Sequence, residues 1–222
     1  MDKLIPTFKQ SVLDSALLDS TTDIIELGID SVLNDGLLKD LPFFNLLLGT
    51  MHTVKNIRDR NFLKNTVLFI NSLNAKEISP KKLSQYREKL NNEKTAEQEL
   101  GRVLVILDRY VDSIKSRVLG IIFRKYIEEE YSWSKFCELS DILSRLFIED
   151  IPYLNGIATA PDSIAVYHIY EIPYNIKRLE GIGLVEIYGK YARFGDRLLQ
   201  AEEMHVQLTE NGNIFYRVQG YL

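Results

Sequence analysis

Residues 176–186 read Ile-Lys-Arg-Leu-Glu-Gly-Ile-Gly-Leu-Val-Glu, and residues 206–212 read Val-Gln-Leu-Thr-Glu-Asn-Gly. The first stretch places apolar residues at helical spacing, stops at glycine and continues directly into an apolar strand. Gly181 and Gly183 suit the end of such a helix, because glycine adopts a positive φ at little cost. These patterns predict a helix over residues 173–181, a strand over 184–187 and a second strand over 205–208.

This order of elements resembles the last helix and the wing of a winged helix-turn-helix domain. The resemblance covers the C-terminal third of the chain, residues 149–222. It implies a small α+β domain that binds a macromolecule, with Ile176 and Leu179 facing its interior. It also implies a wing tip over roughly residues 188–203, which is longer than most hairpin loops.

Two stretches depart from the family pattern. The helix-turn-helix expected before Pro173 is poorly formed, since residues 167–170 could equally form a strand. Asn211 and Gly212, between two apolar runs, also indicate a β-hairpin. The family pattern instead starts a terminal helix at Thr209, and we favour that helix.

The resemblance implies a binding surface on the exposed side of the last helix and on the wing. Its residues are Tyr174, Asn175, Lys177 and Arg178 on the helix, and Lys190, Tyr191, Arg193, Phe194 and Arg197 on the wing. Aromatic residues among basic ones are compatible with phosphate contact and base stacking. The same residue types are enriched at protein–protein interfaces. Residue type alone therefore leaves both DNA and a protein as partners.

The charge balance favours the protein partner. The chain carries a net charge of −4, and from residue 150 onward nine acidic side chains stand against six basic ones. Affinity for DNA comes largely from neutralised phosphates, so an acidic domain is poorly suited to it. We therefore expect a non-enzymatic regulatory or adaptor protein that binds a protein partner. The alternative is a DNA-binding regulator, which would usually act as a homodimer across two half-sites.

The remainder of the chain, residues 1–148, is expected to be a helical bundle, which makes the protein mainly α. Apolar residues recur at helical spacing through most of it. Thr95 and Gln98 form a capping-box pair that predicts the start of one helix, and breaks are expected at Ser116 and at residues 131–132. The helices are expected over about 5–17, 24–33, 42–57, 61–74, 80–90, 95–114, 118–130 and 133–148.

No pattern in the chain indicates catalysis, a cofactor or a metal. The histidines, His52, His168 and His205, are far apart in sequence and lack the spacing of a zinc helix. Cys137 lies beside Phe136 on a core-facing helix, which favours buried packing over nucleophilic chemistry. Glycine fingerprints for phosphate binding are also missing. We therefore expect no catalytic, cofactor-binding or metal-binding residues.

The apolar stretch 37–54 is followed by Lys55, Arg58, Arg60 and Lys64, so the segment 37–64 could lie on a membrane surface. A core helix with basic residues at its C-terminal end explains the pattern more simply, and we expect no membrane partner. The longest uncharged apolar run, residues 41–54, is too short to span a bilayer. The start of the chain lacks the layout of a secretion signal, which favours a cytoplasmic protein.

Overall fold

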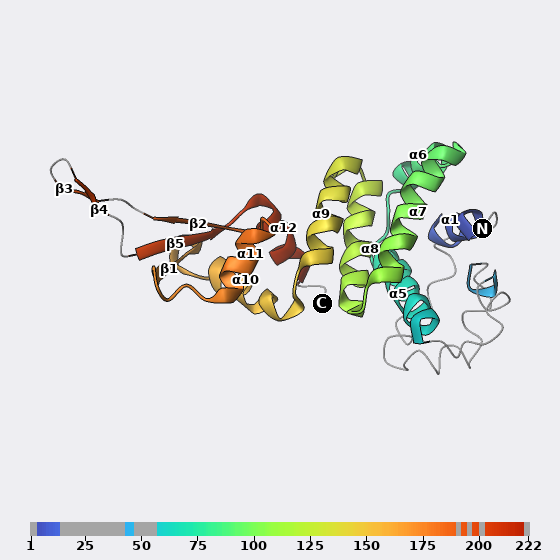
Figure 1. Ribbon diagram of the computed structural model, residues 1–222. Coiled ribbons are helices and arrows are strands. Elements are labelled where there is room, and N and C mark those ends of the chain that lie inside the picture. Colours follow the sequence, from blue (N-terminus) through green and yellow to red (C-terminus); the bar gives the residue numbers. More distant parts are fainter. Residues whose placement is uncertain are drawn as a thin grey trace. The chain divides into compact units, whose positions relative to one another are not determined.

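The computed structural model of the protein describes residues 4–13, 43–46, 57–189, 192–194, 197–199 and 203–219. The fold is mainly helical, with a small antiparallel sheet in the C-terminal part, which confirms the predicted fold class (Figure 1). The chain divides into two compact units, residues 1–140 and 141–222. This division falls within helix α9 (Trp133–Arg145), a few residues before the boundary expected after residue 148.

The N-terminal unit consists of helices. Its described elements are α1 (Leu4–Leu13), α5 (Ile57–Asn74), α6 (Pro80–Lys89), α7 (Glu93–Arg109), α8 (Ser113–Ile127) and the first part of α9. Helix α5 packs against α8 and α7, while α1 packs against α7 and α6 against α8. Residues 43–46 are also helical. The predicted helix over 24–33 and most of the one over 42–57 lie outside the described residues.

The core of this unit is aromatic. Phe123 of α8 is fully buried, and its ring centroid lies 5.6 Å from that of Phe69 and 5.2 Å from that of Phe136. Gly120 lets α5 and α8 come this close. A Cβ atom at Gly120 would overlap the Phe69 carbonyl oxygen and lie 3.0 Å from the Leu73 nitrogen.

The capping box predicted at Thr95 and Gln98 is wrong. Helix α7 begins at Glu93, and the side-chain oxygen of Asn92 accepts a hydrogen bond from the Thr95 backbone N–H at 3.3 Å. Asn92 is therefore the N-cap, because its side chain satisfies one of the amides that have no partner within the helix.

Replacing Asn92 with alanine should lower the free energy of unfolding of the N-terminal unit by about 1 kcal/mol, the usual loss for an N-cap. Thr95→Ala should change it by less than about 0.5 kcal/mol, as surface substitutions usually do. Urea denaturation followed by circular dichroism measures both. A loss at Thr95 as large as that at Asn92 would favour the capping box instead.

The break expected at Ser116 is also wrong. Helix α7 ends at Arg109, α8 starts at Ser113, and Ser116 is buried inside α8. The Nδ2 group of Asn65 in α5 donates hydrogen bonds to the carbonyls of Leu107, at 3.0 Å, and Tyr110, at 2.7 Å. A residue more than forty positions away thus satisfies carbonyls at the end of α7, where helices leave them without partners.

The C-terminal unit combines short helices with a three-stranded sheet. Its elements are the 3-10 turn η2 (Ile148–Asp150), α10 (Ile151–Ala158), η3 (Pro161–Ser163), β1 (Ile164–His168), α11 (Tyr174–Gly181), β2 (Val185–Gly189), β5 (Glu203–Leu208) and α12 (Glu210–Gln219). The strand order is β1-β5-β2, with antiparallel neighbours. Two further strands, β3 (Ala192–Phe194) and β4 (Arg197–Leu199), pair with each other (Figure 1). The expected wing tip over 188–203 therefore contains a ladder of its own.

One face of the sheet is covered by helices. Val206 of the central strand is buried and lies opposite Ala165 in β1 and Ile187 in β2. Helix α10 packs on β1 and β5, α11 on β2 and α12 on β5. Because strand side chains alternate between faces, the opposite face carries Val166 and His205, which are also paired across the strands.

The predicted helix and both predicted strands around the glycines are confirmed. Ile176 and Leu179 of α11 are fully buried, and Gly183 has a φ of 80°. The stretch 167–170 follows the strand alternative, since β1 ends at His168 and residues 169–173 form no helix.

The terminal helix is confirmed as α12, and the hairpin indicated by Asn211-Gly212 does not form. Thr209 fixes the start of this helix. Its hydroxyl accepts a hydrogen bond from the Gly212 N–H at 3.0 Å and donates one to the Gly183 carbonyl at 2.7 Å. A threonine hydroxyl that accepts a hydrogen bond from an amide of the first turn is typical of the N-terminus of a helix.

Candidate functional site

The best-defined polar site of the C-terminal unit is built around Asp150. This residue ends η2, where the chain turns into α10, and its side chain is 2% exposed. Its carboxylate accepts hydrogen bonds from Asn175 Nδ2 at 2.6 Å and from Arg178 Nε at 2.8 Å, and a second Arg178 nitrogen bonds the same group. Such a two-point pairing of arginine with a carboxylate fixes orientation as well as charge. Asp150 thereby connects the start of α10 to α11.

The hydrogen bonds keep this pair ionised. Burial alone would raise the pKa of Asp150, but the hydrogen bonds from Arg178 and Asn175, together with the Arg178 charge, hold that pKa below its ordinary value. The hydrogen bond to Asp150 in turn raises the pKa of Arg178. The carboxylate is therefore charged at neutral pH, and the charge of Arg178 is already balanced within the unit.

Two exposed aromatic rings flank the same guanidinium. The Arg178 carbon Cζ lies 4.9 Å from the ring centroid of Phe147 and 5.2 Å from that of Tyr174. Phe147 is 53% exposed and Tyr174 is 70% exposed, although both are large apolar side chains. Cation–π contacts of this geometry are favourable and hold the rings in place. We call Phe147, Asp150, Tyr174, Asn175 and Arg178 the Arg178 cluster.

The structure brings together three of the nine residues predicted for the binding surface. Tyr174, Asn175 and Arg178 belong to the Arg178 cluster, and Lys177 is exposed elsewhere on α11. The remaining five belong to the wing. Lys190 and Tyr191 lie outside the described residues, while Arg193, Phe194 and Arg197 are placed by backbone only, with Phe194 opposite Arg197 in the β3–β4 ladder.

The sequence did not single out Asp150 or Phe147. Asp150 stands directly before Ile151 and Pro152, a position typical of an N-cap. That pattern marks the start of α10 correctly, but the side chain makes no capping hydrogen bond. It bonds α11 instead, and Arg178 is 28 positions away, so no local spacing could indicate the pair.

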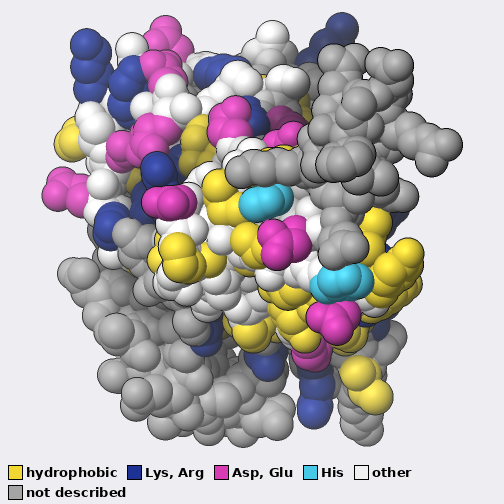
Figure 2. All heavy atoms as spheres, turned by 90° about the vertical axis from the view of Figure 1, so that its left-hand side faces the viewer, with side chains coloured by type: hydrophobic (Ala, Val, Ile, Leu, Met, Phe, Trp, Pro, Cys, Tyr) yellow, Lys and Arg dark blue, Asp and Glu magenta, His cyan; other side chains and the backbone are white. Residues whose placement is uncertain are grey.

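The charges around the sheet are mixed. On the face drawn in Figure 2, hydrophobic side chains lie around histidine side chains, and acidic side chains are interspersed with basic ones. Glu180 and Glu171 are exposed on or just before α11, close in sequence to Lys177. Acidic residues are thus close in sequence to the exposed Lys177 of α11.

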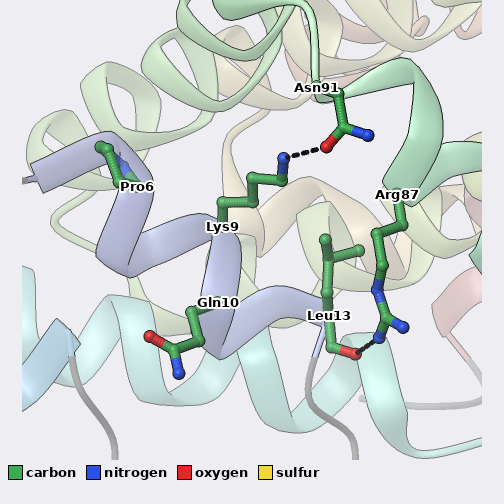
Figure 3. A pocket seen from close by; sticks show the side chains of 6 residues that line it. All are labelled: Pro6, Lys9, Gln10, Leu13, Arg87 and Asn91. Carbon is green, nitrogen blue, oxygen red and sulfur yellow. Dashed lines mark hydrogen bonds between the residues drawn. The ribbon is translucent and has the colours of Figure 1, made fainter.

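The N-terminal unit has a cavity of about 470 Å³ beside α1 (Figure 3). It is lined by Pro6, Lys9, Gln10, Leu13, Arg87 and Asn91. Lys9 Nζ donates hydrogen bonds to the Leu90 carbonyl at 2.8 Å and to Asn91 Oδ1 at 3.1 Å. Arg87 donates one to the Leu13 carbonyl at 3.0 Å. Lys9 and Arg87 therefore connect α1 to α6 and to the segment between α6 and α7, and we assign them a structural role.

The buried carboxylate of Glu99 in α7 takes part in a hydrogen-bond network that connects helices. It accepts hydrogen bonds from Tyr86 at 3.1 Å, from Tyr126 at 2.7 Å and from Lys89 at 2.6 Å. Burial, followed by the negative charge of Glu99 and its hydrogen bonds, raises the pKa of both tyrosines. The tyrosine hydroxyls thus donate hydrogen bonds to the Glu99 carboxylate, and the network joins α6, α7 and α8.

Within the described residues, no three His, Cys, Asp or Glu side chains gather to form a candidate metal site. Among the same residues, no helix is long and apolar enough to cross a membrane. The segment weighed for a membrane surface is described only in part. Its Arg58, in α5, donates a hydrogen bond from Nε to Asp108 at 3.0 Å, so this cation is already paired.

Known protein families, curated proteins and solved structures give no match to this chain.

Proposed function

We propose that the protein is a non-enzymatic regulatory or adaptor protein whose C-terminal unit binds a protein partner. The Arg178 cluster is the observation that carries this proposal. Two exposed rings, Phe147 and Tyr174, each contact a guanidinium whose charge is balanced by buried Asp150. Aromatic residues and arginine dominate the binding energy of protein interfaces, and rings fixed in advance lose little entropy on binding.

The same contacts argue against DNA as the partner. Asn175 and Arg178 were two of the polar residues available on α11 for a nucleic acid, and both bond Asp150. Phosphates are neutralised by cations that are free to approach them. On α11 this leaves Lys177, next to the acidic Glu180, in a domain with a net negative charge.

The proposal treats the unit as a winged-helix-like module. Its support is the succession of α11, a glycine with positive φ, the paired strands β2 and β5, and the terminal helix α12. Residues 169–173, directly before α11, contain no helix that could serve as the first helix of a helix-turn-helix. An incomplete DNA-reading motif is better suited to docking a protein. A cytoplasmic location is part of the same proposal.

The partner-binding prediction is tested on the two rings. Partners are captured from the native source with the full chain, and the affinity of the captured protein is then measured by calorimetry. Phe147→Ala with Tyr174→Ala should weaken binding by tenfold or more, as expected for interface hot spots. Val111→Ala is the matched control, since Val111 is 85% exposed in the N-terminal unit. Unchanged affinity in the double variant would contradict the proposed surface.

The DNA alternative is tested separately. Fluorescence anisotropy with a random-sequence duplex at about 50 mM and about 200 mM salt should detect no binding, since phosphate contacts dominate non-specific affinity. Binding that weakens steeply with salt and is lost in Lys177→Ala would instead establish the DNA-binding regulator.

A further inference from the structure

Strand β1 is one edge of the three-stranded sheet. The strand order β1-β5-β2 leaves β1 and β2 at the two edges. Residues 164–168 read Ile-Ala-Val-Tyr-His, without a proline, a glycine or a lysine, arginine, aspartate or glutamate. The flanking turns already use one backbone group at each end of β1: the Ile164 N–H donates a hydrogen bond to the Pro161 carbonyl, and the His168 carbonyl accepts one from the Glu171 N–H at 2.8 Å. Apart from the ladder with β5, the backbone of Val166, at the middle of the strand, makes no further hydrogen bond to another described residue.

An edge strand can form backbone hydrogen bonds with a strand of another chain. Natural proteins normally protect an edge strand with charges, prolines, bulges or a covering segment. The other edge, β2, contains Glu186, whose side chain accepts a hydrogen bond from Gln207, and ends at Gly189. In β1, by contrast, Val166 is 52% exposed on the face that the helices leave uncovered. The edge and this apolar side chain therefore form one continuous surface for a strand.

We propose that β1 pairs antiparallel with β1 of a second copy of the chain, about a two-fold axis at Val166. The two sheets then join into one sheet across the subunits. In this register Val166 lies opposite the second copy's Val166, on the face without helices. Ala165 lies opposite the second copy's Tyr167, and Ile164 opposite the second copy's His168.

The register suits a second copy because β1 is self-complementary. On the helix-covered face, the small side chain of Ala165 lies opposite the large side chain of the second copy's Tyr167. The two-fold axis produces this pair twice. No like charges meet within the paired strands, since residues 164–168 contain no lysine, arginine, aspartate or glutamate. A two-fold interface uses the same patch on both subunits, as this pairing requires. Opposed valines add a favourable cross-strand contact.

The first test measures the mass of the full chain by sedimentation velocity from micromolar to millimolar concentration. The wild type should shift toward a dimer as concentration rises. Val166→Lys and Val166→Glu should each raise the dimer dissociation constant by tenfold or more, because like charges meet at the axis. An equimolar mixture of the two variants should recover the dimer. Val105→Lys, at a residue that is 50% exposed in the N-terminal unit, is the matched control.

The second test fixes the register with disulfides in a Cys137→Ser background. Val166→Cys should cross-link to itself on oxidation, and Ile164→Cys should cross-link to His168→Cys in a mixture more than either does alone. Val111→Cys should remain uncross-linked. Circular dichroism confirms that each variant is folded. A wild type that stays monomeric at millimolar concentration, or a dimer that neither Val166 charge weakens, would overturn the pairing. A monomer that pairs with a foreign strand through β1 would overturn it as well.

Discussion

Replacing Gly212 with alanine is expected to lower the free energy of unfolding of the C-terminal unit by about 2–3 kcal/mol, the upper range for overpacking a tight site. Gly212 lies in the first turn of α12, where this helix meets the end of β5. A Cβ atom there would overlap the carbonyl oxygen of Leu184 and lie 3.2 Å from the Leu208 Cβ atom. Because the obstacle is backbone, α12 must shift, which also strains the Thr209 hydrogen bonds that start it.

Gly181→Ala is the matched control for this substitution. It is also a helical glycine of the same unit, but a Cβ atom there meets nothing within 4 Å. Alanine is a better helix former than glycine, so the change should raise the free energy of unfolding by about 0.5 kcal/mol. Hydrogen exchange of the β5 amides reports on this unit alone, which matters because the lone tryptophan, Trp133, lies in the other unit. Equal protection in both variants would show that α12 tolerates the added methyl group.

Gly212 also shows how a local signal can mislead. Asn-Gly is a strong hairpin signal between apolar runs, yet here the glycine is required by the close approach of Leu184 to a helix. Thr209, three positions earlier, supplies the competing signal, since its hydroxyl caps α12. The helix could be favoured from the sequence because the family resemblance placed its start at Thr209. The reason for the glycine could not, because Leu184 is distant in sequence.

The elements that local patterns determine were predictable. Helix α11 and strand β2 follow from an amphipathic run that ends at glycine, and Gly183 has the positive φ that this order requires. The boundary between α7 and α8 was not predictable. It contains neither glycine nor proline, and the side chain that satisfies it, Asn65, belongs to α5. Helical spacing continues across the break and hides it.

The candidate site also has a part that the sequence predicted and a part that it did not. The exposed residues of α11 were expected to face a partner, and Tyr174 is 70% exposed. Arg178 was expected there as a free cation. It bonds a carboxylate buried at a distant position, and a charge count cannot reveal that. The interpretation of the C-terminal unit as a protein-docking module therefore depends on a tertiary contact.

Replacing Asp150 with alanine is the second change with a large expected effect. It should lower the free energy of unfolding of the C-terminal unit by about 2 kcal/mol, within the range for hydrogen bonds to charged groups, because the Arg178 side chain is 36% exposed and can be hydrated once its partner is removed. Asn175 and Arg178 would lose their shared hydrogen-bond acceptor. Because the Asp150 side chain is only 2% exposed, its truncation would also leave a small cavity. Asp150→Asn keeps the shape but removes the charge, so its loss should be smaller. Hydrogen exchange of α10 and α11 amides measures both.

The pH dependence provides an independent check on the charge of Asp150. Because the pKa of Asp150 is lowered in the folded protein, its contribution to stability is fully present above the unfolded pKa of about 4. It is lost as the pH falls through the lower, folded pKa. The free energy of unfolding of the wild type should therefore exceed that of Asp150→Asn by a constant amount from about pH 5 to pH 8. This difference should shrink as the pH falls below about 4. An advantage that does not change with acid would show that the pair stabilises the unit by shape rather than by charge.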